Sequence, residues 1–172
     1  MELKVITNPL AGTGPAKGLL SNLFYGCGYN FYRREHRLRA DDRLIRRKLR
    51  QLLRESRAHV NSHLIAWAHV AAATAALQCA QRELEAMELA ILSTALPNAD
   101  RLHQRHQEER GALEKLVALD GEALLALVTL RDAIARLDDG TAATVAMRQL
   151  LRASEFSALW TRREALLAGD SG

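Results

Sequence analysis

The sequence contains few residues that interrupt helices. Only 3 of its 172 residues are proline, and glycine is sparse after Gly28. Aromatic residues are also scarce, at 5 % of the chain. This composition is typical of an all-helical protein, and a chain of this length usually folds as one domain.

Cysteine is scarce too, and neither a leader-like segment nor a long apolar run is evident. Cys27 and Cys79 are too few and too far apart for a zinc motif or a disulfide framework. The first residues lack a basic segment followed by an apolar core, and the longest nearly apolar run, residues 64–77, is too short to span a bilayer. We therefore expect a reducing compartment and a cytoplasmic protein, with a peripheral position at a membrane as the alternative.

The stretch from about Ala40 to Leu96 contains neither proline nor glycine. Its apolar side chains recur every seven residues, at Val70, Leu77, Leu84 and Ile91. The pattern predicts one continuous helix, roughly 85 Å long at the usual helical rise. The apolar seam indicates that this helix packs against another long helix.

A second helical segment follows Pro97, which is expected to end the first. Gly121 weakens this segment and marks a candidate break, and a firmer break is expected at residues 138–140. Thr141 then caps a last helix, which we expect to reach about Ala168. The seven-residue pattern of the second segment consists of Leu113, Asp120, Leu127 and Ile134.

These periodicities predict an all-α fold. We expect a long antiparallel helical hairpin, coiled-coil-like, with one or two further helices, giving a three- to four-helix bundle. Along the chain, we predict a partly irregular N-terminal arm rich in glycine and aromatics at residues 1–37 and a helical domain at residues 38–168. A disordered tail is expected at residues 169–172.

The N-terminal arm opens with a glycine-rich turn. Residues 1–7 suit a short strand, and they are followed by Asn8-Pro9-Leu10-Ala11-Gly12-Thr13-Gly14. This strand and its Asn-Pro-x-x-Gly-x-Gly turn resemble the opening of the diacylglycerol-kinase-like family, which implies a phosphate-binding loop. No second glycine-rich motif and no alternation of strands and helices follows, and Lys17 precedes Gly18 instead of completing a Walker motif. We therefore predict a turn-rich arm.

Positive charge is concentrated in one segment. Residues 33–57 contain eleven basic and four acidic residues, a net charge of +7, whereas the whole chain carries +4. The predicted second helix reaches back only to about residue 58 of the first, so residues 40–57 lack an intrachain partner helix. A local positive charge of this kind favours an anionic partner.

Five of the chain's eight aromatic residues come just before this basic segment, between Phe24 and Tyr32. Aromatic side chains beside arginines can stack on single-stranded nucleic acid or insert at a membrane interface. In the alternative interpretation, they fold back and cover the exposed seam of the long helix.

The predicted function is that of a non-enzymatic, oligomeric helical adaptor or scaffold, which docks an anionic or helical protein partner, or a second copy of itself, through residues 24–57. One alternative is a nucleic-acid-binding protein that uses the same basic helix, and another is a peripheral membrane-binding protein. The candidate partner-binding residues are Phe24, Tyr25, Tyr29, Phe31, Tyr32, Arg33, Arg34, Arg37, Arg39, Arg43, Arg46, Arg47, Lys48, Arg50 and Arg54.

Histidines supply only weak metal candidates. His59 and His63 follow Glu55 on one helical face, and His103 and His106 follow Asp100 on another. The predicted hairpin keeps the two groups apart, so no metal or other cofactor is expected. No catalytic arrangement and no small-molecule substrate is evident either.

Overall fold

The computed structural model describes residues 18, 20, 24, 26–29, 32, 38–94, 111–138 and 140–168. This part of the chain is all-helical, which confirms the predicted fold class. The helices are α2 (Leu38–Ala66), α3 (Ala71–Ser93), α5 (Ala112–Ala135), α6 (Gly140–Ala153) and α7 (Phe156–Ala168). None of the helices described is long and apolar enough to cross a membrane.

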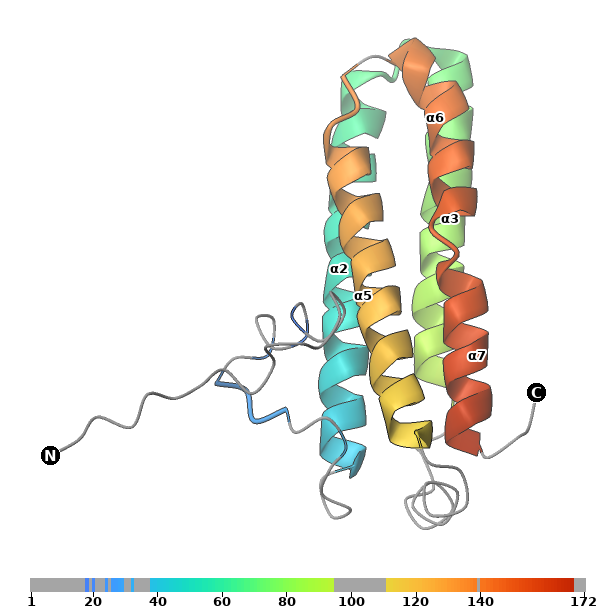
Figure 1. The fold of residues 1–172 in the computed structure, drawn as a ribbon. Coiled ribbons are helices and arrows are strands. Elements are labelled where there is room, and N and C mark those ends of the chain that lie inside the picture. The colour runs from blue at the N-terminus through green and yellow to red at the C-terminus, as the bar shows by residue number, and fades with distance from the viewer. Residues whose placement is uncertain are drawn as a thin grey trace, which may run out of the picture.

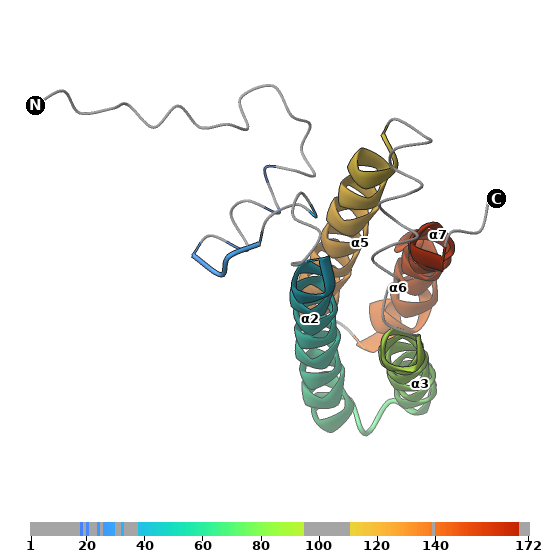
Figure 2. The ribbon, with the colours of Figure 1, turned by 90° about the horizontal axis from the view of Figure 1, so that it is seen from below.

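The helices form a four-helix bundle in which α6 and α7 together make the fourth rod (Figure 1). Helix α2 packs against α3 and α5, while the α6–α7 rod packs against α3 through α6 and against α5 mainly through α7. Viewed from the end, α2 and α7 therefore lie on one diagonal of the bundle and α3 and α5 on the other (Figure 2). Helices α2 and α5 run in one direction, and α3 and the α6–α7 rod run in the other (Figure 1).

The prediction of one continuous helix over residues 40–96 is wrong. The chain turns at residues 67–70, so α2 and α3 form an antiparallel hairpin within that stretch. The second predicted segment pairs differently as well, because α5 lies parallel to α2 instead of antiparallel to it.

The turn is held by tertiary packing around Trp67. Its ring stacks on His63 with centroids 4.4 Å apart. A Cβ atom on Gly140, the first residue of α6, would lie only 3.1 Å from the Trp67 Cγ atom, so the absence of a side chain lets the indole approach. The chain here contains neither glycine nor proline, and packing overrides a strong local preference for helix.

Two further helix breaks were predicted from the sequence, and only one of them is present. Helix α5 continues through Gly121, because its backbone remains helical from Ala112 to Ala135. The break at residues 138–140 is confirmed. The last predicted helix is interrupted at Ser154 and Glu155, where Glu155 adopts a positive φ of 49°.

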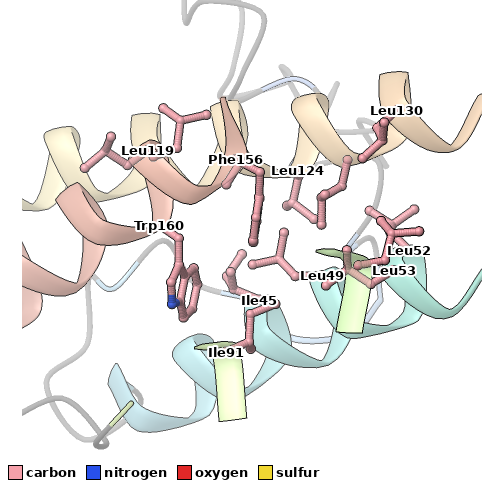
Figure 3. Packing of buried hydrophobic residues seen from close by; sticks show 14 of the residues in the cluster. Ile45, Leu49, Leu52, Leu53, Ile91, Leu119, Leu124, Leu130, Phe156 and Trp160 are labelled. Atoms are coloured by element: carbon pink, nitrogen blue, oxygen red, sulfur yellow. The ribbon is translucent and has the colours of Figure 1, made fainter. Parts of the chain in front are cut away.

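The core runs along the centre of the bundle, and side chains from α2, α3, α5 and α7 meet there (Figure 3). Most of the predicted seam is confirmed, because Leu77, Leu84, Ile91, Leu127 and Ile134 are buried in one cluster. Val70 is the exception, since it precedes α3 and is only half-buried. The expectation that residues 40–57 lack an intrachain partner is wrong, since α3 and α5 cover that part of α2. Its apolar side chains lie in or against the core, namely Leu49, Leu52 and Leu53, which are buried, and Leu44, which is partly buried.

Candidate functional site: the basic face of helix α2

The basic residues of α2 fall into two sets, and the first set is neutralised within the fold. Arg50 Nε lies 3.5 Å and Arg54 Nε 3.0 Å from Oε1 of Glu88 on α3. Arg57 contacts the same carboxylate at 3.3 Å and Glu85 at 2.6 Å. Two glutamates one turn apart on α3 therefore offset much of the positive charge that the sequence concentrates on α2.

The second set faces solvent. Arg39, Arg43 and Arg47 are exposed, and no ion pair or hydrogen bond joins them to any other residue in the described part of the chain. They follow one another at intervals of four residues, which places them on one helical face about 6 Å apart. We call these three residues the arginine stripe. The neighbouring Lys48 is half-buried and donates to Gln51 Oε1 at 3.3 Å.

Two exposed leucines lie on α3 beyond the glutamates that pair with α2. Leu89 and Leu92 are 63 % and 52 % exposed. Each follows by four residues one of the glutamates that pair with α2, so both continue that edge of α3 toward the start of α2. Arg46 donates to the carbonyl oxygen of Ile91 at 2.9 Å, which fixes this end of α3 beside α2. We call the arginine stripe together with Leu89 and Leu92 the candidate docking surface.

Behind the docking surface lies a buried ionic cluster. Arg163 of α7 contacts Asp120 of α5 at 2.5 Å and Asp42 of α2 at 2.8 Å, and all three side chains are fully buried. Arg46 contacts the second oxygen of Asp42 at 2.8 Å and also reaches Glu164 at 3.0 Å. Buried charges need such partners, because removing an unpaired charge from water is strongly unfavourable.

An indole ring completes this cluster. The guanidinium carbons of Arg46 and Arg163 lie 5.0 Å and 4.8 Å from the centroid of the Trp160 ring. Cations at this distance are attracted by the negative face of the ring. Arg46 is therefore a structural residue, and its burial takes it out of the surface that a partner can reach.

The described aromatic residues of the N-terminal arm pack against the same cluster. Tyr32 is fully buried, and its hydroxyl donates to Asp120 at 2.6 Å and accepts from Arg163 at 3.1 Å. Tyr29 donates to the same Asp120 oxygen at 3.4 Å, and its ring lies 5.0 Å from that of the buried Phe24. For these three aromatics, the interpretation in which they fold back onto the helices describes the structure.

The surroundings shift several pKa values. Burial raises the pKa of Tyr32 and that of Tyr29 well above the usual value, and the Asp120 carboxylate adds to the effect. Burial also raises the pKa of Asp120, against the opposing influence of Arg163 and the Tyr32 hydrogen bond. The pKa of Arg163 is raised although burial lowers it, because Asp120 favours the guanidinium cation. Both tyrosines therefore stay neutral hydrogen-bond donors.

Of the four histidines considered as metal ligands, the structure describes His59 and His63, which both lie on α2. His63 Nε2 lies 2.8 Å from the Ile134 carbonyl oxygen, so this nitrogen carries the proton and is not free to bind a metal. His59 is half-buried on the same helix. In the described ranges, no three histidine, cysteine, aspartate or glutamate side chains are grouped as a metal would require. The remaining predicted residues, namely Tyr25, Phe31, Arg33, Arg34, Arg37, His103 and His106, lie outside the described residues.

Four residues of the ionic cluster were not among the predicted site residues, namely Asp42, Asp120, Arg163 and Glu164. One signal was present, because Asp120 occupies a position of the seven-residue pattern that is otherwise apolar. A charged residue on a buried seam implies a buried partner, but the sequence does not say that Arg163, 43 residues later, is that partner.

No family model, no curated protein and no solved structure matches this chain. Its function therefore has to be argued from the surface and the cluster described above.

Proposed function

We propose that this protein is a non-enzymatic helical adaptor that docks an acidic amphipathic helix of a partner protein. The proposal rests on one observation above all. Within α2, Arg50 and Arg54 reach a carboxylate of the same chain, whereas Arg39, Arg43 and Arg47 do not pair with any residue in the described ranges. The fold thus neutralises one set of arginines and leaves the other available.

The arginine stripe is unfavourable for the isolated chain. Like charges four residues apart on a helix repel each other by about 0.2–0.5 kcal/mol per pair. Arg43 has such a neighbour on each side, in Arg39 and Arg47. An anionic partner would relieve this repulsion, and charge complementarity of this kind also speeds association.

Leu89 and Leu92 favour an amphipathic partner over a purely acidic one. Large apolar side chains that are more than half exposed lose contact with water when they meet another apolar surface. Leu89 and Leu92 are three residues apart, so they share one face of α3 and can meet the apolar face of a partner helix together. A partner helix with leucines on one face and glutamates beside them matches both parts of the docking surface.

Other readings of the basic helix have less support. Stacking on nucleic-acid bases or insertion into a membrane would use the aromatic arm, but Phe24 and Tyr32 are buried in the core. The sequence argument for self-association relied on an uncovered apolar side of residues 40–57, and α3 and α5 cover that side. The nucleic-acid and membrane readings are retained as outcomes of the test.

The test measures binding of a synthetic acidic amphipathic helix, with glutamate and leucine on opposite faces, by fluorescence anisotropy. We expect salt-dependent binding that falls at least tenfold in the variant Arg43→Glu/Arg47→Glu. The matched control is Arg148→Glu/Arg152→Glu on α6, which alters two exposed arginines at the same spacing and changes the net charge equally. A peptide of the same composition in scrambled order should bind more weakly.

Equal losses in the two double variants would show that only net charge matters, and the proposal would fail. Tighter binding to duplex DNA, with a steep dependence on salt, would favour the nucleic-acid reading instead. Binding to vesicles that contain phosphatidylserine, at the expense of the peptide, would favour the membrane reading.

A further inference from the structure

A groove lies between α5 and the α6–α7 rod, on elements that do not contribute to the docking surface. Its volume is about 410 Å³, within the range of roughly 300–1,000 Å³ that is usual for small-molecule sites. Four leucines from both sides line it, together with two glutamates at its rim. These residues are Leu125, Leu130, Leu150, Leu159, Glu122 and Glu155.

The apolar part of the groove is incompletely covered by the fold. Leu125 is 48 % exposed, although Leu130, one turn and a half further along α5, is buried. Ser154 also lines the groove, and its hydroxyl already donates a hydrogen bond to the Leu151 carbonyl oxygen at 2.8 Å. The groove therefore offers apolar contact area with little unsatisfied polarity below the rim.

The charged groups that line the groove are both carboxylates. Glu122 and Glu155 are exposed, and neither forms an ion pair with another residue in the described ranges. Helices α5 and α7 are antiparallel, and the contact between Asp120 and Arg163 sets their register. In that register, the two glutamates are offset along the groove by on the order of 10 Å at helical rise.

Glu155 has a second, independent peculiarity. Its φ of 49° lies in the left-handed region, which residues other than glycine and asparagine seldom adopt. A glutamate at a position that would suit glycine better is maintained against a conformational penalty. The position follows the end of α6, where a left-handed residue, usually glycine, commonly terminates a helix, so the fold explains the conformation and the glutamate side chain is the unusual choice.

We propose that this groove binds a small molecule with an apolar body and a cationic group, of the aliphatic amine class. The leucines remove the apolar body from water, and one rim carboxylate pairs with the ammonium group. Bulk electrostatics act against this preference, because the chain as a whole carries a net charge of +4. Selection of a cation by this protein therefore has to come from local carboxylates.

The experiment compares three probes with the same alkyl chain, namely n-octylamine, 1-octanol and octanoate, each below its solubility limit or micelle concentration. Binding to the full chain is followed by calorimetry and by amide chemical shifts. We expect octylamine to bind at least tenfold more tightly than octanol, with octanoate weakest and the largest shifts along the groove. Equal binding of the three probes, or shifts centred elsewhere, would overturn the proposal.

Substitutions then assign the preference to the rim. Glu122→Gln/Glu155→Gln should reduce octylamine binding to the level of octanol and leave octanol binding unchanged. The control is Glu114→Gln, since Glu114 is exposed near the start of α5 and outside the groove. If the amine keeps its advantage in the double variant, these carboxylates are not its partners and the proposal fails.

Glu155→Gly separates binding from folding. Glycine accepts the positive φ, so the variant should unfold at the same or a higher temperature than the natural protein. It should nevertheless lose part of the preference for octylamine over octanol. A variant with unchanged stability and unchanged amine preference would show that Glu155 takes no part in the site.

Discussion

The Nε atom of Arg163 lies 2.5 Å from Oδ1 of Asp120, and neither side chain is exposed to solvent. The same guanidinium reaches Asp42, so a single arginine on α7 connects α7 to α5 and to α2. Tyr32 adds the N-terminal arm through hydrogen bonds to both members of the pair. Because each of these charges is buried, any slip of one helix along another would leave one of them without a partner.

The two members of this pair should therefore not contribute independently to stability. We expect Arg163→Met to lower the free energy of unfolding by about 3–5 kcal/mol, because it leaves the buried Asp120 carboxylate without a cation. Asp120→Leu should cost less, because Arg163 keeps Asp42 as a partner. The double variant should lose less than the sum of the two single losses. Denaturant unfolding of all four proteins measures this, and additive losses would show that the pair does not act as a unit.

The buried tyrosines provide a prediction about pH. The pKa values of Tyr29 and Tyr32 are raised well above the usual value of about 10. A raised pKa in the folded state gives stability that is fully present below the pKa of an unfolded tyrosine and is lost as pH rises through the folded pKa. We therefore expect at most one of the chain's three tyrosines to ionise while the protein remains folded.

Ultraviolet absorbance of tyrosinate, recorded together with circular dichroism during an alkaline titration, tests this expectation. Tyr32→Phe is the informative variant, because it should weaken the dependence of stability on pH above about pH 10. Titration of all three tyrosines with the helices intact would show that the N-terminal arm does not pack as described.

Much of the fold was predictable because it depends on a repeating pattern. The spacing of Leu77, Leu84 and Ile91 identified a buried seam without reference to any other element. The turn after Ala66 was not predictable in this way, because it packs through Trp67 against Gly140, 73 residues further along the chain. A local pattern carries no information about such a contact.

The candidate site shows the same limit. Counting charges correctly identified the basic segment of α2, but it could not separate Arg54, which pairs with Glu88, from Arg47, which does not. That distinction depends on which residues of α3 lie opposite α2, and the sequence predicted no such pairing. The aromatic residues Phe24 and Tyr32 were predicted to bind a partner, but both are buried in the structure. Interfaces and cores both favour aromatic side chains, so a cluster of aromatics in a sequence does not distinguish the two.

The core seam gives a quantitative prediction. Leu84 is fully buried on α3, and Leu84→Ala should lower the free energy of unfolding by about 2–5 kcal/mol because it leaves a cavity. Leu89 lies five residues away on the same helix and is largely exposed, so Leu89→Ala should change the free energy of unfolding by less than about 0.5 kcal/mol. Denaturant unfolding measures both, and similar losses would show that the register of α3 is wrong.

The hairpin of α2 and α3 can be tested against a continuous rod. Arg57 and Glu85 form an ion pair at 2.6 Å across the hairpin, whereas in one unbroken helix they would lie roughly 42 Å apart. After Cys27 and Cys79 are changed to serine, the variant Arg57→Cys/Glu85→Cys should react with a short bis-maleimide. We expect a cross-link within one chain, detected by mass spectrometry.

The mass of the product decides between two arrangements that would both bring these positions together. An antiparallel dimer of two continuous rods would also place residue 57 near residue 85, but of the other chain, because the two positions are equally far from residue 71. That dimer would give a product of twice the chain mass, and its yield would fall on dilution. The hairpin predicts a monomeric product whose yield is independent of concentration, since Trp67 on Gly140 holds the turn within one chain. The pair Arg39→Cys/Arg82→Cys is the control, because the hairpin keeps it roughly 30 Å apart and beyond the reach of the reagent.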